Sequence, residues 1–294
     1  MITENTRYLA LLGLALVLSA GLGAQTAAPA APKLEFPAAS PAASLKQRVG
    51  LTDIELNYAR PGAKGRVVFG ALVPYGKVWR TGANTATKIK FSTAVNFGGA
   101  AIPAGSYELF TIPGEKEWTV IVHKDSSQWG AYAYKQENDV ARVTVKPVAL
   151  TAAVETLEID FNDLRGESAT LNLSWANVRV PVAITVDLVA TLVPQIEAVM
   201  ASDAAKKPYV NAAMFYLDNK LDLKQAARWM DAAIAAQPEL YYLVYRKGLI
   251  LAAAGDKAGA LASAEASLAA AQKAGGPIGE EYTGLNRKLI ASLK

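Results

Sequence analysis

One stretch of the chain concentrates the residue types that bind anions. Between Leu56 and Tyr107 there are seven basic residues and no acidic one, although the whole chain has 30 Lys and Arg against 26 Asp and Glu. The seven are Arg60, Lys64, Arg66, Lys77, Arg80, Lys88 and Lys90. The stretch is also rich in glycine and proline, which are typical of turns whose outward backbone amides can hold an anion. We therefore treat this basic stretch as the candidate binding region.

The side chains in and near the basic stretch suit a small ligand. Guanidinium groups bind carboxylates and phosphates in bidentate fashion, and aromatic rings offer a flat apolar surface to a sugar or other planar group. We predict a site formed by Arg60, Lys64, Arg66, Tyr75, Trp79, Arg80, Asn84 and Trp129. The predicted ligand is a small anion or a carbohydrate-like molecule. The alternative is that these residues brace the edge of a sandwich by pairing with Asp139, Asp160 or Asp163.

His123 is the only histidine, and it follows the apolar alternation of residues 118–122. A hydrolase would pair it with Ser126 or Ser127 and a carboxylate. The Gly-x-Ser-x-Gly turn that marks a strained nucleophile is absent from the sequence. We therefore predict no catalytic residue and keep a hydrolase that uses His123 as an alternative.

Composition excludes several classes of site. The chain has no cysteine, which rules out disulfides, thiolate catalysis and iron–sulfur clusters. With a single histidine as well, we predict no metal and no cofactor. The formal charge of +4 in 294 residues is far below that of a typical nucleic-acid binder, so no nucleic-acid partner is expected.

Period-two alternation indicates a β-rich domain over residues 44–190. For example, Ile54 and Leu56 share one face of a run, and Leu171 and Leu173 share one face of another. The runs are short and are separated by Gly, Pro, Asn and Asp. This pattern predicts an antiparallel β-sandwich or jelly-roll-like fold.

The pattern becomes helical after Pro194, where alanine is abundant and the apolar spacing turns to three and four. We expect helices over 210–217, 224–236, 240–253, 257–274 and 279–293. Residues 222–226 align with residues 256–260 at an offset of 34, which is the tetratricopeptide period. We predict a tetratricopeptide-like region over 195–294 that contacts a protein partner, with an ordinary helical-hairpin tail as the alternative.

The N-terminus has the features of an export signal. Arg7 precedes an apolar run from Tyr8 to Leu18, and small residues follow up to Ala24. The run is the length of a signal-peptide core and is short for a membrane span. We predict a signal peptide over 1–24, an Ala/Pro-rich linker over 25–43 and a periplasmic or secreted location with no membrane span after cleavage. An N-terminally membrane-anchored protein is the alternative.

Several long motifs occur in order along residues 34–188. They are residues 60–66, 69–87, 104–113, 129–132 and 139–142. Together they resemble the bacterial domain of unknown function family 2911. The resemblance implies exported bacterial proteins with a β-rich domain, sometimes followed by tetratricopeptide-like helices, and no established activity.

These observations predict an exported, non-catalytic binding module for a small anionic or carbohydrate-like ligand, with a helical tail for protein interaction. Two alternatives stay open, an envelope hydrolase and a purely structural envelope protein.

Overall fold

The computed structural model describes residues 34, 36–124 and 128–294. The predicted signal peptide, the predicted linker up to residue 33, and Ser126 and Ser127 lie outside the described residues.

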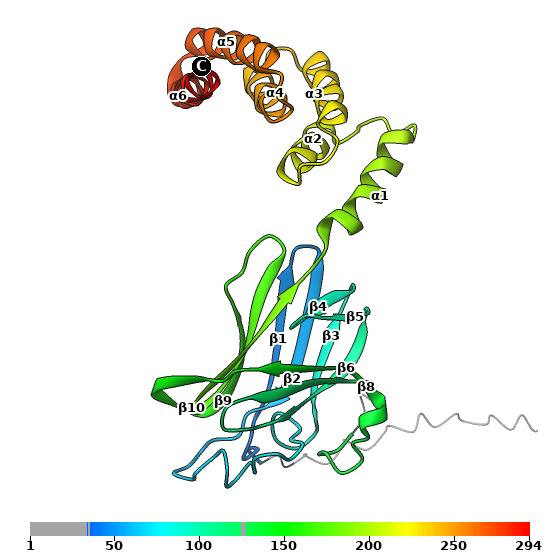
Figure 1. Ribbon diagram of the computed structural model, residues 1–294, viewed down its shortest axis with the longest axis vertical. Coiled ribbons are helices and arrows are strands. Elements are labelled where there is room, and N and C mark those ends of the chain that lie inside the picture. The colour runs from blue at the N-terminus through cyan, green and yellow to red at the C-terminus, as the bar shows by residue number, and fades with distance from the viewer. Residues whose placement is uncertain (1–33, 35, 125–127) are drawn as a thin grey trace, which may run out of the picture. The chain divides into compact units, whose positions relative to one another are not determined.

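Two antiparallel sheets form the β domain (Figure 1). The larger has the order β1-β2-β3-β6-β7-β8, formed by β1 (Ala42–Val49), β2 (Thr52–Ala59), β3 (Thr87–Phe91), β6 (Gly105–Ile112), β7 (Trp118–His123) and β8 (Asp139–Val145). The smaller has the order β5-β4-β10-β9, formed by β5 (Ala100–Ile102), β4 (Val95–Phe97), β10 (Ser168–Thr185) and β9 (Val148–Asn162). The predicted antiparallel β fold is confirmed, and β1 takes in the last two residues of the predicted linker.

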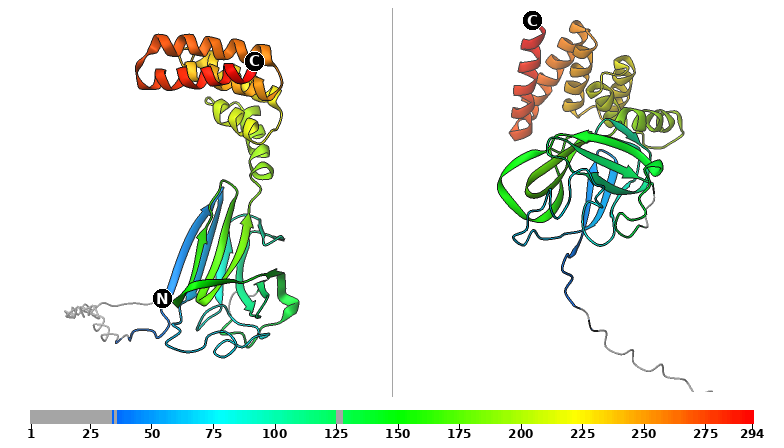
Figure 2. Two further views of the ribbon diagram at one scale, coloured as in Figure 1. Left: turned by 60° about the vertical axis from the view of Figure 1, so that its left-hand side comes forward. Right: turned by 60° about the horizontal axis from the view of Figure 1, so that its bottom comes forward.

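The core lies between the two sheets because alternate residues of each strand are apolar and point inward. Leu56, Leu109 and Val120 of the larger sheet and Leu171 and Leu173 of the smaller one are buried in a single apolar cluster. Residues 60–86 connect β2 to β3 and lie at the end of the sandwich opposite the β1–β2 turn (Figures 1 and 2). The basic stretch is therefore mainly a long connection at one end of the domain.

The outer face of the larger sheet is not uniformly solvated. Over β1 to β3 it carries exposed ion pairs, including Lys46 with Asp53 and Lys90 with Glu55. Over β6 and β7 it is covered by loops, and a second small apolar cluster forms there around Ala86, Phe110 and Ile121, which are buried. This covered part of the outer face holds the candidate site.

Helices form the part of the chain that follows β10. They are α1 (Leu188–Ala201), α2 (Tyr209–Asp218), α3 (Leu223–Ala236), α4 (Tyr241–Ala253), α5 (Lys257–Ala274) and α6 (Gly276–Leu293). The predicted helical tail is confirmed, but α1 was not expected from the sequence. Pro194 lies inside α1, and an internal proline usually argues against a helix because it removes a backbone donor. The Asp187 carboxylate begins α1 by accepting a hydrogen bond from the Ala190 amide at 2.7 Å.

The 34-residue offset relates equivalent positions of two helix pairs. Asp222 and Asp256 are the N-caps of α3 and α5, and their carboxylates accept amide hydrogen bonds at 2.9 and 2.8 Å. Ala226 and Ala260, also 34 residues apart, are both fully buried. The small side chains let neighbouring helices approach closely.

Two glycines of α6 provide a paired test of this close packing. A Cβ at Gly279 would lie 2.6 Å from the Ala271 carbonyl oxygen, whereas a Cβ at Gly284 would meet nothing within 4 Å. We expect Gly279→Ala to lower the free energy of unfolding by about 1–3 kcal/mol through overpacking. Gly284→Ala should raise it by about 0.5–1 kcal/mol through helix propensity. Urea denaturation followed by circular dichroism measures both, and equal shifts in one direction would contradict the packing.

Candidate functional site

The first three predicted site residues lie in the loop after β2 and fasten that loop. Arg60 donates from Nε to the Leu157 carbonyl oxygen at 2.9 Å. The backbone amide of Lys64 donates to Glu155 Oε1 at 2.8 Å. Arg66 donates to two carbonyl oxygens of its own loop at 2.9 and 2.7 Å. The Arg60 and Arg66 side chains therefore serve the fold of the loop, whereas Lys64 fastens it through its backbone and leaves its side chain exposed.

Trp79 lies in the core. Its side chain is 9% exposed, and its ring stacks on Trp175 with centroids 5.8 Å apart and an interplanar angle of 21°. The indole nitrogen donates to the Gly82 carbonyl oxygen at 3.0 Å. Phe69 packs edge-on against both tryptophans. Trp79 is therefore placed to stabilise the end of the sandwich.

Tyr75 also packs locally. The Cβ position of Gly70 lies 2.9 Å from the Tyr75 ring, and Gly70 has a positive φ of 89°. Only glycine fits there without strain, because the ring covers the space of a side chain. The Tyr75 side chain is 40% exposed, and its ring closes this turn.

The remaining predicted residues lie in two loops that run side by side. We call residues 80–86 the Arg80 loop and residues 128–135 the Trp129 loop. The Ala86 amide donates to the Gln128 carbonyl oxygen, and the Gly130 amide donates to the Asn84 carbonyl oxygen, both at 3.3 Å. A β-bridge joins Thr85 to Trp129. The structure thus brings Arg80, Asn84 and Trp129 into one pair of loops.

The Arg80 loop has an unusual backbone. Thr81 and Asn84 have positive φ values of 55° and 60°. This conformation is a strong outlier for a β-branched residue such as threonine. Thr81 is fully buried, and its hydroxyl donates to the Thr111 hydroxyl at 3.2 Å. The surrounding packing holds the strain, and such strain is concentrated at functional sites.

Arg80 points to the covered outer face. An antiparallel bridge pairs Trp79 with Thr111, which sets Arg80 opposite Phe110. Since side chains alternate, Trp79 faces the core and Arg80 the opposite side. Arg80 Nε is buried and has no hydrogen-bond partner among the described residues. A buried donor without a partner is costly, so Arg80 retains unused binding capacity.

Trp129 differs from every other tryptophan of the chain. Its side chain is 65% exposed, whereas the other four tryptophans are at most 9% exposed. Tyr132, three residues further along, is 90% exposed. Large aromatic rings at the surface are typical of binding surfaces. The Trp129 loop therefore presents two rings beside the Arg80 loop.

A buried polar group lies beneath the Trp129 loop. Glu108 of β6 and His123 of β7 are direct cross-strand neighbours, and both side chains are fully buried. Glu108 Oε1 accepts a hydrogen bond from the Gln128 amide at 2.8 Å. His123 Nε2 lies 3.1 Å from the Lys135 carbonyl oxygen, and Nδ1 lies 3.4 Å from Gln128 Nε2. The sequence did not single out Glu108 or Gln128 as site residues.

A second polar group closes the Trp129 loop. The Tyr134 hydroxyl donates to Asp139 Oδ2 at 2.7 Å. Arg142 donates from one guanidinium nitrogen to the Tyr134 hydroxyl oxygen and to the same Asp139 Oδ2. Burial, followed by the interaction with Asp139, raises the pKa of Tyr134 to about 12. Asp139 therefore has Arg142 as its ion-pair partner, rather than an arginine of the basic stretch.

The raised pKa of Tyr134 predicts how stability changes in alkali. The folded state favours the neutral phenol, so its contribution is complete below the unfolded pKa near 10 and is lost as the pH rises through about 12. We expect Tyr134→Phe to flatten the fall of the melting temperature between these two pH values. Tyr132→Phe, at an exposed position, is the control and should follow the wild-type curve. Identical slopes for wild type and Tyr134→Phe would contradict the assignment.

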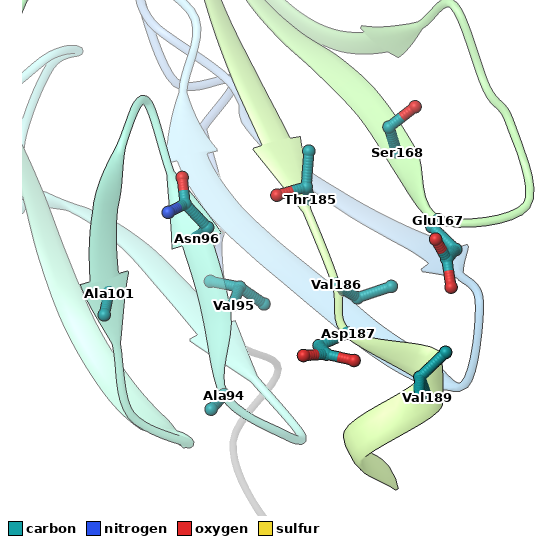
Figure 3. A pocket seen from close by; sticks show the side chains of 10 residues that line it. All are labelled: Ala94, Val95, Asn96, Ala101, Glu167, Ser168, Thr185, Val186, Asp187 and Val189. Carbon is teal, nitrogen blue, oxygen red and sulfur yellow. The ribbon is translucent and has the colours of Figure 1, made fainter. Parts of the chain in front are cut away.

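An open hollow of about 660 Å³ lies elsewhere, beside β4, β5 and the two ends of β10 (Figure 3). Its polar lining includes Asn96, Glu167, Ser168 and Asp187, and no basic side chain lines it. Asp187 is already the cap of α1. The hollow does not suit an anion, and the sequence-predicted residues lie outside it.

In the described part of the chain, no cluster of three or more His, Cys, Asp or Glu side chains has the arrangement of a metal site. Within the same residues, no helix combines the length and apolar character needed to cross a bilayer.

Comparison with known proteins identifies the β domain. Residues 40–184 match the family described as "Protein of unknown function (DUF2911)". The chain matches no curated protein and no solved structure. The match spans β1 to β9 completely and includes both loops of the candidate site. Residues 40–184 of this chain are therefore a DUF2911 domain, and helices α1 to α6 follow it.

Proposed function

We propose that the chain is an exported, non-catalytic binding module whose Arg80 and Trp129 loops hold a small anionic or carbohydrate-like ligand. The observation on which this rests is the buried Nε of Arg80, which has no hydrogen-bond partner among the described residues. Nε itself is covered in this conformation, so a ligand carboxylate, phosphate or sulfate becomes its acceptor only when the covering side chains shift. An anionic sugar would satisfy both the guanidinium and the aromatic rings.

Each residue of the proposed site has a distinct part. Arg80 provides the positive charge and a planar donor group. Trp129 and Tyr132 provide exposed ring faces against which a sugar or planar group packs. Asn84 provides an exposed amide, whose Nδ2 makes only a long contact of 3.5 Å with the Ser40 carbonyl oxygen. Trp79 and the loop after β2 are left out because their groups serve the fold.

No observation on the described residues favours the hydrolase. The His123 ring is fully buried and is packed between Phe110 and Tyr134, with centroids 5.4 and 5.3 Å away. A general base must reach the proton it removes in a bound substrate. The burial of His123 supports a structural part for this residue.

A ligand screen by thermal shift tests the proposed function. The panel should contain phosphate, sulfate, small carboxylates, neutral sugars, anionic sugars and cell-wall fragments. A ligand that binds only the folded state raises the melting temperature with concentration. We expect the anionic members to stabilise the protein in a saturable way. A panel in which only neutral sugars, or no compound, raised the melting temperature would count against the anion site.

We propose that residues 1–24 direct export and that the mature chain is periplasmic or secreted. N-terminal sequencing of the protein from a periplasmic or culture fraction should read Gln25 as the first residue. Recovery of the protein with Met1 in the cytoplasmic fraction would contradict this part. The helical region is the proposed surface for a protein partner.

A further inference from the structure

The single histidine contacts both ends of the Trp129 loop. His123 Nε2 meets the Lys135 carbonyl oxygen at 3.1 Å, and Nδ1 meets the Gln128 side-chain amide at 3.4 Å. Glu108, directly across from His123, accepts the Gln128 backbone amide at 2.8 Å. Two neighbouring side chains thus bind the first and last residues of the segment that presents Trp129.

Because these polar side chains are buried, their hydrogen bonds restrict the conformation of the Trp129 loop. The side chains of Glu108 and His123 are both fully buried, with 0% exposure each, and His123 Nδ1 lies 3.9 Å from Glu108 Oε2. Polar groups in such surroundings strongly favour the geometry that satisfies them. The contacts on the Trp129 loop go to backbone atoms as well as to Gln128, so they restrict the path of the loop itself.

The same residues are not needed to pair the strands. β6 and β7 are joined by a regular backbone ladder from Glu108–His123 to Ile112–Thr119. The apolar core lies on the opposite face, where Leu109 and Val122 point inward. A plain sheet at this position would need no buried acid and no buried histidine. Both side chains hydrogen-bond to the Trp129 loop.

We propose that Glu108 and His123 are positioning residues that clamp the Trp129 loop to the sheet and hold Trp129 beside the Arg80 loop. Their use in ligand binding rests on the proposed function, but the clamp itself is a property of the free protein. In the neutral imidazole, Nε2 donates to the Lys135 carbonyl oxygen, which leaves Nδ1 to accept from the Gln128 amide. The clamp therefore uses both ring nitrogens.

Amide hydrogen exchange of the full chain measures the clamp without any ligand. In Glu108→Met and His123→Leu, which keep bulk but lose the polar atoms, we expect the Gln128 and Gly130 amides to exchange at least about tenfold faster. Glu108→Gln and His123→Gln keep an oxygen or nitrogen at the required reach. These two should stay within about threefold of the wild-type rate.

Val122→Ala is the matched control for general destabilisation. Val122 precedes His123 on β7 and is fully buried in the sandwich core. We expect this variant to lower the melting temperature while the ratio of the Gln128 and Gly130 amide exchange rates to the exchange rates of the β6 and β7 amides stays as in wild type. In Glu108→Met and His123→Leu that ratio of rates should rise, because only the loop is released.

Trp129 supplies a second, optical readout. As the only tryptophan more than 9% exposed, it dominates the emission that iodide quenches. The iodide-sensitive component should show lower anisotropy in Glu108→Met than in wild type or Glu108→Gln. Equal exchange in the loop and the strands for all variants, or unchanged Trp129 anisotropy, would overturn the clamp. A failed ligand screen with released loops in Glu108→Met would overturn only the proposed function.

Discussion

Replacing Trp79 by alanine is expected to lower the free energy of unfolding of the β domain by about 3–5 kcal/mol. The ring is 9% exposed and stacks on Trp175 while its nitrogen donates to the Gly82 carbonyl oxygen. Its removal leaves a cavity among aromatic side chains and an acceptor without its donor. Urea denaturation followed by tryptophan fluorescence and circular dichroism gives the change directly.

Trp129→Ala is the control for that experiment because it removes the same side chain from an exposed position. With 65% of the Trp129 side chain exposed, we expect a change within about 0.5 kcal/mol. A small loss for Trp79→Ala together with a large loss for Trp129→Ala would reverse the assignment of the two tryptophans. It would also return Trp79 to the binding site predicted from the sequence.

Replacing Arg80 by alanine is expected to weaken the binding of an anion by about 10–100-fold, which is the value of a charge-assisted hydrogen bond. The melting temperature should change little, because Arg80 Nε has no hydrogen bond among the described residues to lose. Arg80→Lys should restore the charge but not the planar donor pair. Isothermal titration with the strongest anion from the screen measures all three proteins.

Arg66→Ala is the matched control for charge removal. Arg66 donates to carbonyl oxygens of its own loop and has no hydrogen bond or ion pair with the Arg80 or Trp129 loop among the described residues, so we expect unchanged affinity. A large fall in melting temperature for Arg80→Ala without any effect on binding would assign Arg80 to the fold. Equal weakening by Arg66→Ala and Arg80→Ala would indicate general electrostatic attraction rather than a site.

Much of the fold was predictable because apolar periodicity reports directly on the buried face of each element. The helix expected over 257–274 is α5 with the same bounds, and the Asp256 carboxylate caps its start in the structure. The exception is α1, where Pro194 and neighbouring β-branched residues hide a helix. The Asp187 cap begins this helix, and Val193, Ile196 and Met200 pack, partly buried, against the helical core.

The candidate site was predictable only in part because loop paths are set by tertiary contacts. Trp79 and Arg80 are adjacent and equally prominent in the sequence, yet the bridge from Trp79 to Thr111 sends one inward and the other outward. Arg80, Asn84 and Trp129 do come together in two loops. Their use in binding stays a prediction.

The sequence did not indicate the buried polar group beneath the Trp129 loop, and the position of Glu108 gives the reason. Strand alternation places it on the face opposite Leu109, which in a two-layer sandwich is usually solvated. Only the fold shows that residues 128–135 cover this face and bury Glu108 completely. The available signal was a lone acid inside a strand that is otherwise largely apolar and that directly follows the acid-free stretch.

The central claim is that Arg80 and Trp129 belong to one anion-binding site, and the most direct test is nitrogen-15 NMR of their side chains during titration. The chain has five tryptophans, so the Trp129 indole signal can be assigned with Trp129→Phe. We predict that a stabilising anion shifts both the Arg80 Nε–H signal, which gains an acceptor, and the Trp129 indole signal, with one shared dissociation constant. Saturable binding that leaves both signals unchanged would contradict the claim.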